Sequence, residues 1–371
     1  MKIAVVHDWL NGMRGGEKVL EAILEIYPQA AVYTLFRQRK KVSRSIESHR
    51  IVTSWLNRIP GVYHHYRTLL PLFPVAVESF DLRGVDLVIS SSHAVAKGVR
   101  AASAIHICYC HTPMRYIWDA EDDYGFNRGR YLAMRALRSR LRRWDRETAN
   151  RVDHFIANSR FVQERIRRYY GRDSEIIYPP VDTEFFTASP SCRREEFYLA
   201  SGALVPYKRI DKVIEAFNKL GRRLVVAGDG PELNRLRKIA KTNVEFLGWV
   251  TDEELQRLYR SARALVTAGR EDFGIVVVEA QACGCPVVAL SAGGSLETIQ
   301  DGVNGILFAE QHVDDIVRAI HRFETMTWPV ERVRHQVERF SRENFQARIR
   351  SFVSERTAGS SAVRVAEVQP A

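Results

Sequence analysis

The sequence contains few cysteines and no long hydrophobic run. Its five cysteines in 371 residues are an odd number, and its two Cys-x-Cys pairs lack the nearby His pairs of a zinc site. Such thiols are typical of reduced core cysteines in the cytosol. No apolar run approaches the roughly 18 residues of a membrane-spanning helix, and the chain begins with a strand pattern rather than a signal peptide. We therefore expect a cytoplasmic protein that is neither exported nor membrane-spanning.

Two common nucleotide-binding fingerprints are also missing. The sequence has no Walker A motif, and neither Gly15-Gly16 nor Gly228-Asp229-Gly230 has the third glycine of G-x-G-x-x-G. The pair Gly15-Gly16 still precedes an apolar-periodic helical pattern, where backbone N–H groups can approach a phosphate. Tight strand-to-helix turns also use glycine without any ligand, so this pair alone is weak support for a site.

The remaining composition predicts a globular two-domain protein. Hydrophobic residues make up 46% and charged residues 27%, and the length exceeds one ordinary core. Strand and helix patterns alternate in two series. The first series of expected strands covers residues 2–7, 31–35, 87–90, 105–110, 154–157 and 175–178. The second covers residues 197–201, 224–227, 244–247, 264–267, 287–289 and 306–308.

This alternation predicts an α/β fold of two doubly wound, Rossmann-like domains facing a cleft. Ligands of such sheets bind at the carboxyl ends of the strands. We expect an N-terminal domain over residues 1–185 and a second domain over residues 195–330. A C-terminal helical segment over residues 331–356 should return to the N-terminal domain, followed by a disordered tail over residues 357–371.

The net charge of +11 requires a partner or a solvated face. Much of it lies between residues 128 and 151, where four arginines fall on one face of an expected helix: Arg135, Arg138, Arg142 and Arg146. Such a helix could lie on an anionic membrane surface, or it could pack on the core with a solvated outer face. We favour the first interpretation and expect peripheral association with the inner face of the cell membrane. No pattern of a nucleic-acid-binding module is present, so we expect no nucleic-acid partner.

The segment 271–279 carries the strongest functional signal. Glu271 and Glu279 bracket Gly274 and an apolar run. If the run is helical, Gly274 opens a helix whose free N–H groups and positive dipole end suit a phosphate. Carboxylates beside an anion site accept hydrogen bonds from hydroxyl groups. A ligand that has both a phosphate and such hydroxyl groups is a nucleotide sugar. An isolated Glu at a helix end is otherwise most often solvated or part of a cap.

Two further segments place ionisable side chains just after expected strands. His111 follows the strand 105–110 and begins a loop with aromatic residues and one arginine, where it could serve a site or simply hold the loop. Lys208 and Arg209 follow the strand 197–201. Their positive charges could neutralise a departing diphosphate.

In these motifs the chain resembles glycosyltransferase family 4, of the two-domain GT-B type. The similarity runs from Met1 to about Phe352 and rests on the order and spacing of several short motifs. The loop His-Thr-Pro-Met-Arg-Tyr-Ile-Trp-Asp at 111–119 and Val-Pro-Tyr-Lys-Arg at 205–209 resemble bacterial O-antigen and exopolysaccharide mannosyltransferases. Ala203 departs from the pattern, because many members carry an Arg there. Arg209 could substitute for it, or the site could rely on Lys208 with the helix N-terminus.

The resemblance implies a set of site residues. The expected catalytic residues are His111, Lys208 and Glu271. The expected donor-binding residues are Gly15, Gly16, Arg209, Gly228, Gly230, Phe246, Gly248, Phe273, Gly274, Ile275 and Glu279. By this resemblance Glu279 would hold the ribose, Glu271 the transferred sugar and Lys208 the diphosphate, while Gly16 and His111 would approach from the N-terminal domain.

The implied activity is a retaining glycosyl transfer without a metal or other cofactor. The expected donor is a nucleotide sugar, GDP-mannose, and the expected acceptor is a lipid-linked saccharide of a cell-surface polysaccharide. Alternatives are a UDP-sugar donor, a nucleotide-sugar epimerase or a phosphorylase on the same architecture, and a catalytically silent binding scaffold. The acidic run Glu121-Asp122-Asp123 resembles a metal-binding D-x-D, but a solvated or acceptor-contacting loop is the favoured interpretation.

Overall fold

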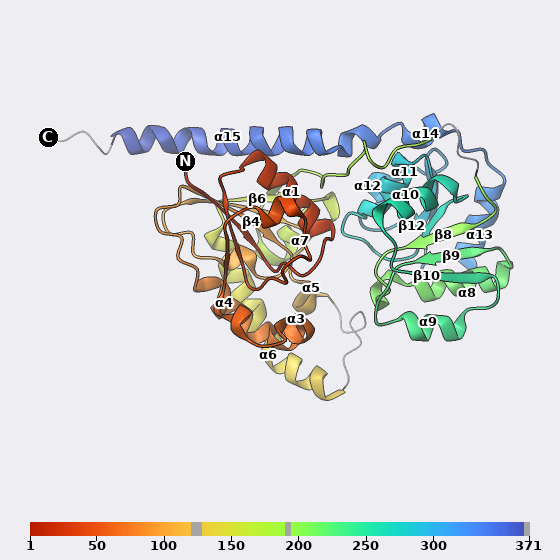
Figure 1. The fold of residues 1–371 in the computed structure, drawn as a ribbon, viewed down its shortest axis with the longest axis horizontal. Coiled ribbons are helices and arrows are strands. Elements are labelled where there is room, and N and C mark those ends of the chain that lie inside the picture. Colours follow the sequence, from red (N-terminus) through yellow and green to blue (C-terminus); the bar gives the residue numbers. More distant parts are fainter. Residues whose placement is uncertain (120–127, 190–193, 367–371) are drawn as a thin grey trace. The chain divides into compact units, whose positions relative to one another are not determined.

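The computed structural model describes residues 1–119, 128–189 and 194–366. Within these ranges, only the backbone is described for residues 128–136 and 359–366. The chain divides into two compact units (Figure 1). Unit 1 contains the described residues of 1–120, 126–180 and 343–371, and unit 2 those of 181–342. Each unit is built on one parallel sheet. Among the described helices, none is long and apolar enough to cross a membrane.

Unit 1 has a seven-stranded sheet in the order β3-β2-β1-β4-β5-β6-β7. Its strands are β1 (Ile3–His7), β2 (Ala31–Thr34), β3 (Ile51–Thr53), β4 (Leu87–Ser92), β5 (Ile105–Cys110), β6 (His154–Ala157) and β7 (Ser174–Ile176). Its helices include α1 (Gly15–Ile26), α2 (Arg44–Glu47), α3 (Val62–His65), α4 (Phe73–Glu78), α5 (Arg115–Trp118), α6 (Arg128–Thr148) and α7 (Arg160–Tyr170). Short 3-10 turns are η1 (Trp55–Arg58), η2 (Tyr66–Leu72), η3 (Ala96–Gly98) and η4 (Ala149–Arg151).

Both faces of this sheet are covered, which explains its unbroken apolar strands. In β1, Ala4 and Val6 join one buried cluster, while Ile3 and Val5 join another on the opposite face. Successive side chains of a strand alternate between faces, so a strand that is buried on both sides needs apolar residues throughout. The residues of β1 are accordingly all buried.

Unit 2 has a six-stranded parallel sheet in the order β10-β9-β8-β11-β12-β13. Its strands are β8 (Tyr198–Ser201), β9 (Leu224–Ala227), β10 (Val244–Gly248), β11 (Leu265–Thr267), β12 (Val287–Leu290) and β13 (Gly305–Phe308). Its helices are α8 (Ile210–Leu220), α9 (Leu233–Ile239), α10 (Asp252–Ser261), α11 (Ile275–Ala282), α12 (Ser295–Thr298), α13 (Val313–Glu324) and α14 (Val330–Arg334). The turns η5 (Pro206–Lys208) and η6 (Val337–Phe340) complete it.

The two doubly wound sheets confirm the predicted fold class, and each predicted strand is present with small differences at its ends. The strand β3, three residues long, was not predicted. The structure places residues 181–186 in unit 2, whereas the sequence analysis assigns residues up to 185 to the N-terminal domain. These residues contact unit 2, because the Val181 N–H donates to the Phe340 carbonyl and the Phe186 ring lies near Tyr259.

The C-terminal helix α15 (Arg342–Ala366) belongs to unit 1 and lies along it in Figure 1. Phe345, Ile349, Phe352 and Val353 share a buried cluster with β1 and α1. Their spacing is that of one helix face. The returning segment therefore begins near residue 343 rather than at the predicted 331, because Phe340 packs against Phe273 in unit 2. The helix continues to Ala366, where the sequence analysis expected a disordered tail from residue 357; residues 367–371 lie outside the described residues.

Candidate functional site

The two sheets each have one point at which the strand order reverses. In unit 2 this switch point lies between β8 and β11, and in unit 1 between β1 and β4. Loops that leave neighbouring strands in opposite directions open a crevice at such a point, which is where doubly wound sheets bind ligands. Several of the candidate site residues in each unit lie at its switch point.

Lys208 and Glu271 meet at the switch point of unit 2. Lys208 ends η5, in the loop after β8, and Glu271 lies in the loop after β11. Lys208 Nζ lies 2.5 Å from Glu271 Oε1, and the two side chains are 15% and 13% exposed. Glu271 Oε1 is buried and has no partner of hydrogen-bond geometry among the described residues. The two opposite charges are thus adjacent, and a ligand that displaced Lys208 would leave this oxygen to accept a hydroxyl.

The backbone holds Glu271 in place. It forms an isolated bridge with Gly293, and its carbonyl accepts the N–H of Gly294 at 3.0 Å. A Cβ added to Gly293 would overlap this carbonyl oxygen. Close backbone contact therefore fixes the direction in which the Glu271 side chain leaves the loop.

The helix α11 begins at Ile275, as the sequence predicts, and Gly274 is its N-cap. Gly274 has φ +86, a left-handed conformation that favours glycine. It has no side-chain cap, so the first N–H groups of α11 are available to an anion. Phe273 is buried against Phe340, which anchors the turn, and Glu279 is buried one turn into the helix.

The remaining predicted donor residues of unit 2 are dispersed over the ends of β9 and β10. The Gly228 N–H donates to the Gly248 carbonyl at 2.7 Å. Added Cβ atoms at Gly228 and Gly230 would overlap the backbone of Gly202 and Leu204, respectively. Glycines at both positions are thus required by packing, whether or not a ligand binds.

The structure gives Phe246 and Arg209 partners of their own. Phe246 packs on the buried cluster of unit 2, with the Arg237 guanidinium 5.9 Å from its ring. Arg209 Nε donates to Asp211 Oδ1 at 3.3 Å. A role for Arg209 in place of the missing arginine at Ala203 would therefore require that it exchange Asp211 for the ligand.

His111 lies with Gly16 at the switch point of unit 1. A Cβ added to Gly16 would lie 3.8 Å from His111 Nε2 and 3.5 Å from His7 Cε1. Gly15 and Gly16 begin α1, as expected. The His111 N–H donates to the Ser92 carbonyl, and Asn158 Nδ2 donates to the His111 carbonyl at 3.0 Å. Burial, with nearby His93 and His7, holds the pKa of His111 well below its ordinary value.

The sequence analysis missed the polar groups that surround His111. Ser91 Oγ lies 2.8 Å from His111 Nε2 and 3.1 Å from His7 Nδ1. His93 Nδ1 lies 3.0 Å from Asp8 Oδ2. A signal was available, because these residues lie at or just after the ends of the expected strands 2–7 and 87–90. Their proximity to His111 depends on the order β1-β4-β5, which the sequence does not state.

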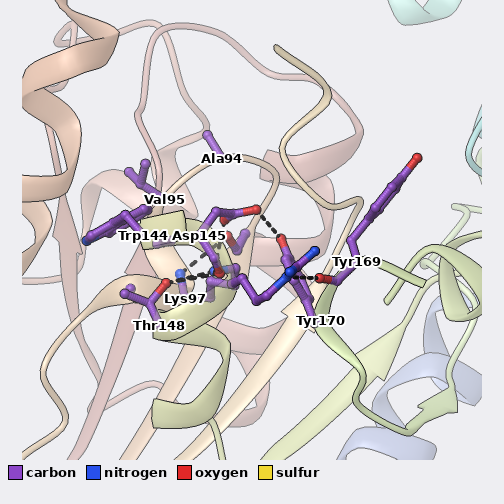
Figure 2. A network of polar contacts seen from close by, with 12 residues as sticks. Ala94, Val95, Lys97, Trp144, Asp145, Thr148, Tyr169 and Tyr170 are labelled. Carbon is purple, nitrogen blue, oxygen red and sulfur yellow. Dashed lines mark hydrogen bonds and ion pairs between the residues drawn. The ribbon is translucent and has the colours of Figure 1, made fainter. Parts of the chain in front are cut away.

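The loop after His111 is anchored by buried charges (Figure 2). Lys97 and Asp145 form a buried ion pair of 2.9 Å, and Lys97 also donates to Thr148 Oγ1 at 2.9 Å. Asp145 Oδ2 accepts from Trp118 Nε1 at 2.6 Å and from the Tyr170 hydroxyl at 2.9 Å. This network joins η3, α5, α6 and α7 below the loop that begins at His111. The acidic run 121–123 lies outside the described residues.

Comparison with known proteins identifies the chain's family. The sequence model of glycosyl transferases group 1 matches residues 182–343, and that of Glycosyltransferase Family 4 matches residues 28–185. The chain belongs to glycosyltransferase family 4. The predicted resemblance is thereby confirmed.

Two curated relatives of this family-4 chain show how far the similarity extends. One is a D-inositol 3-phosphate glycosyltransferase of Streptomyces bingchenggensis, 31% identical over 51% of this chain and 50% of the relative. The other is a GDP-mannose-dependent alpha-(1-6)-phosphatidylinositol monomannoside mannosyltransferase of Mycolicibacterium smegmatis, 32% identical over 47% of this chain and 54% of the relative. The chain spans about half the length of these relatives.

Solved structures share the fold over nearly the whole chain. HepE of Anabaena, in complex with UDP and glucose, has a TM-score of 0.72 at 20% identity and covers 95% of this chain and 99% of its own. Sucrose-phosphate synthase of Thermosynechococcus elongatus has a TM-score of 0.75 at 17% identity, covering 97% and 100%. At such identities the likeness establishes the GT-B fold.

Proposed function

We propose that this chain is a retaining, metal-independent hexosyltransferase that moves mannose from GDP-mannose to a lipid-linked saccharide of a cell-surface polysaccharide. The observation that carries the proposal is the meeting of Lys208 and Glu271, 2.5 Å apart, at the switch point of unit 2. The uncapped N-terminus of α11 follows three residues after Glu271. A cation, an anion-binding helix end and an incompletely bonded carboxylate suit a ligand that combines a diphosphate with sugar hydroxyls.

Each residue has a distinct part in this proposal. Lys208 and the first N–H groups of α11 bind the diphosphate and stabilise the negative charge that develops as it leaves. Glu271, released from Lys208 by the diphosphate, accepts hydrogen bonds from the transferred sugar. Glu279 holds the ribose hydroxyls, and in unit 1 the ring of His111 is available to a hydroxyl of a substrate.

The donor base is the least constrained part of the proposal. A relative's name specifies GDP-mannose, whereas HepE was solved with UDP and glucose. The loop at Gly248 would read the base through backbone atoms, which leaves no side-chain signature. A UDP-sugar donor is therefore the alternative, and a nucleotide-sugar epimerase would be recognised by donor turnover without any acceptor.

Release of GDP from GDP-mannose, measured with a lipid-linked acceptor extract, tests the activity. Thermal-shift measurements with GDP-, UDP- and ADP-sugars test the donor, because a ligand at 100 times its Kd adds about 2.7 kcal/mol of stability. No turnover of any nucleotide sugar by the folded protein would exclude the enzyme. Turnover of UDP-sugars alone would move the donor to the alternative.

Glu271→Gln tests the site. It keeps the size of the side chain and removes its charge, and we expect a loss in kcat/KM on the order of 10²-fold. Glu215→Gln is the matched control, because Glu215 pairs with Lys212 at 2.7 Å on α8 of the same unit. Equal rates for both variants would show that Glu271 does not contact the reacting sugar.

The proposal includes an anionic membrane surface as a partner of the predicted basic helix α6. Arg138 Nε and Arg142 Nε donate to the Ile117 carbonyl, and Arg146 lies over the Trp118 ring. Arg138 and Arg142 thus contact their own unit, whereas Arg140, Arg143 and Arg146 are exposed and the side chain of Arg135 lies outside those described. Co-sedimentation with anionic vesicles should weaken in an Arg140→Glu, Arg143→Glu double variant; unchanged binding would contradict this contact.

A further inference from the structure

One hydroxyl in unit 1 is shared by two histidine rings. Ser91 Oγ lies 3.1 Å from His7 Nδ1 and 2.8 Å from His111 Nε2. A serine hydroxyl has one proton, so it donates to one of these nitrogens and accepts from the other. The pKa of His111 is held well below its ordinary value by burial, so its ring is neutral at neutral pH. With one proton on each imidazole ring, the tautomers of His7 and His111 are linked through Ser91.

Glu17 distinguishes between the two linked arrangements. Its Oε1 lies 3.9 Å from His7 Nε2, and its Oε2 accepts the Arg14 N–H at 3.1 Å. Burial alone would raise the pKa of Glu17, but the contact with the ring of His7 is the largest of the effects that outweigh burial and lower it. Glu17 is therefore ionised at neutral pH, and its negative charge favours a proton on His7 Nε2 over a lone pair there.

The proton positions then follow along the chain of contacts. With its proton on Nε2, His7 offers the Nδ1 lone pair, which accepts the Ser91 hydroxyl proton. Ser91 Oγ in turn accepts the proton of His111 Nε2. His111 is left with an unprotonated Nδ1, which can only accept a hydrogen bond.

We propose that Glu17, acting through His7 and Ser91, holds His111 as its Nε2–H tautomer and so makes Nδ1 a hydrogen-bond acceptor. Resting on the function proposed above, this acceptor takes a hydroxyl of a sugar substrate. Glu17, His7 and Ser91 are positioning residues, since they act on the ligand only through His111. A ring of the opposite tautomer would present a donor at Nδ1 instead.

Two other described residues near His111, His93 and Tyr109, have partners of their own. His93 is paired with Asp8 at 3.0 Å, and its ring centroid lies 6.2 Å from that of His111. The Tyr109 ring lies 5.2 Å from His111, and its hydroxyl donates to the Ile177 carbonyl at 2.9 Å. The tautomer of His111 is therefore set through Ser91.

A second serine–histidine pair on the same strands provides an internal control. Ser90 Oγ lies 2.8 Å from His106 Nε2, and His106 Nδ1 lies 3.2 Å from the Arg151 carbonyl. A carbonyl oxygen only accepts, so the proton of His106 is on Nδ1 and Ser90 donates to Nε2. Burial lowers the pKa of His106 to about 4, so this ring is neutral too. The two pairs should show opposite tautomers in one molecule.

Nitrogen NMR of the full chain with ¹⁵N-labelled histidine, at neutral pH and without substrate, tests the inference. Two-bond nitrogen–proton correlations identify which ring nitrogen carries the proton. We expect His111 as Nε2–H and His106 as Nδ1–H. Glu17→Gln and Ser91→Ala should each shift His111 toward the other tautomer or a mixture, whereas Ser90→Ala should alter only His106.

His111 found as Nδ1–H in the unmodified protein would overturn the inference, even if a variant failed to fold. So would a His111 signal that neither Glu17→Gln nor Ser91→Ala changes. Because no substrate is present, this result is independent of the transferase activity. An active transferase with the wrong His111 tautomer would refute this inference alone, and the expected tautomer in a protein without turnover would refute the proposed function alone.

Activity provides the second readout. Loss of one neutral hydrogen bond to the sugar should lower kcat/KM on the order of 10-fold in Glu17→Gln, with Ser90→Ala unchanged. The Glu17→Gln loss should disappear with a donor that lacks the hydroxyl taken by His111. A loss of the same size with every deoxy-sugar donor would indicate a merely structural role for Glu17 and overturn its assignment as a positioning residue.

Discussion

In unit 2 the ends of the strands are packed backbone against backbone, whereas in unit 1 they are joined by polar side chains. Gly228 and Gly293 each touch a neighbouring carbonyl so closely that no Cβ fits. In unit 1 a Cβ on Gly16 would meet only side-chain atoms at ordinary contact distance, and the strand ends are linked through Ser91 instead. The two switch points thus share a topology, but backbone contacts stabilise the one in unit 2 and polar side chains stabilise the one in unit 1.

The difference predicts different sensitivities. A backbone-packed loop tolerates no added carbon, but its geometry does not depend on protonation. A loop that is held by polar side chains tolerates added carbons, but it depends on each buried donor and acceptor having its partner. Substitutions that add one carbon and substitutions that remove one charge should therefore separate the two units.

Gly228→Ala should have the largest effect on stability. Its Cβ would overlap the Gly202 carbonyl oxygen, and its φ of +146 is unfavourable for alanine. Because the contact is with backbone, β8 and β9 would have to separate. We expect unit 2 to lose cooperative unfolding or the protein to become insoluble, as measured by calorimetry.

Gly221→Ala separates the two causes of this effect. Gly221 has φ +67 at the end of α8, and nothing lies within 4 Å of an added Cβ. This variant should cost only about 1–2 kcal/mol, the penalty of a left-handed alanine. Comparable losses for Gly221→Ala and Gly228→Ala would contradict the idea that backbone contact holds unit 2.

Lys97→Met should have the largest effect in unit 1. It leaves Asp145 buried with a negative charge that the Trp118 and Tyr170 donors do not neutralise. Breaking a buried ion pair by removing one partner typically costs about 3–5 kcal/mol. Chemical denaturation should show this loss, and the double variant Lys97→Met, Asp145→Leu should recover part of it.

The exposed pair Arg167–Asp173 is the control for charge loss. Its atoms are 3.0 Å apart, with side chains 78% and 90% exposed. Arg167→Met should leave the denaturation midpoint unchanged within error, since solvent screens such pairs. If Lys97→Met also left the denaturation midpoint unchanged, the network in Figure 2 would not stabilise unit 1.

Local patterns in the sequence were sufficient for the fold and for the elements of the unit 2 site. Strands that are buried on both faces are continuous apolar runs, and the glycine before an apolar helix marks Gly274 as a turn. The strand β3 was missed because its three residues are only partly buried and form no such run. Lys208 and Glu271 were brought together by one rule, that parallel strands end at the same edge of a sheet.

The side-chain contacts of α6 and of the buried pair in unit 1 could not be predicted. Lys97 and Asp145 lie in segments with other charges, and nothing local distinguishes a buried lysine from a solvated one. The arginines of α6 were interpreted as a possible membrane surface because helical spacing shows that they share a face, not what that face meets. The structure shows that Arg138 and Arg142 meet the Ile117 carbonyl.

Gly16→Ala should have the smallest effect on stability and a large effect on activity. The added Cβ meets His7 and His111 at 3.5 and 3.8 Å, which is ordinary contact, and alanine favours a helix over glycine by at most about 1 kcal/mol. The melting temperature should stay the same or rise slightly. If Gly16 admits a ligand phosphate, the methyl group occupies that approach, and kcat/KM should fall on the order of 10²-fold. Gly12→Ala is the control, because open space surrounds its added Cβ, and it should change neither quantity. A Gly16→Ala variant that stays both stable and active would show that Gly16 is needed only for the turn before α1.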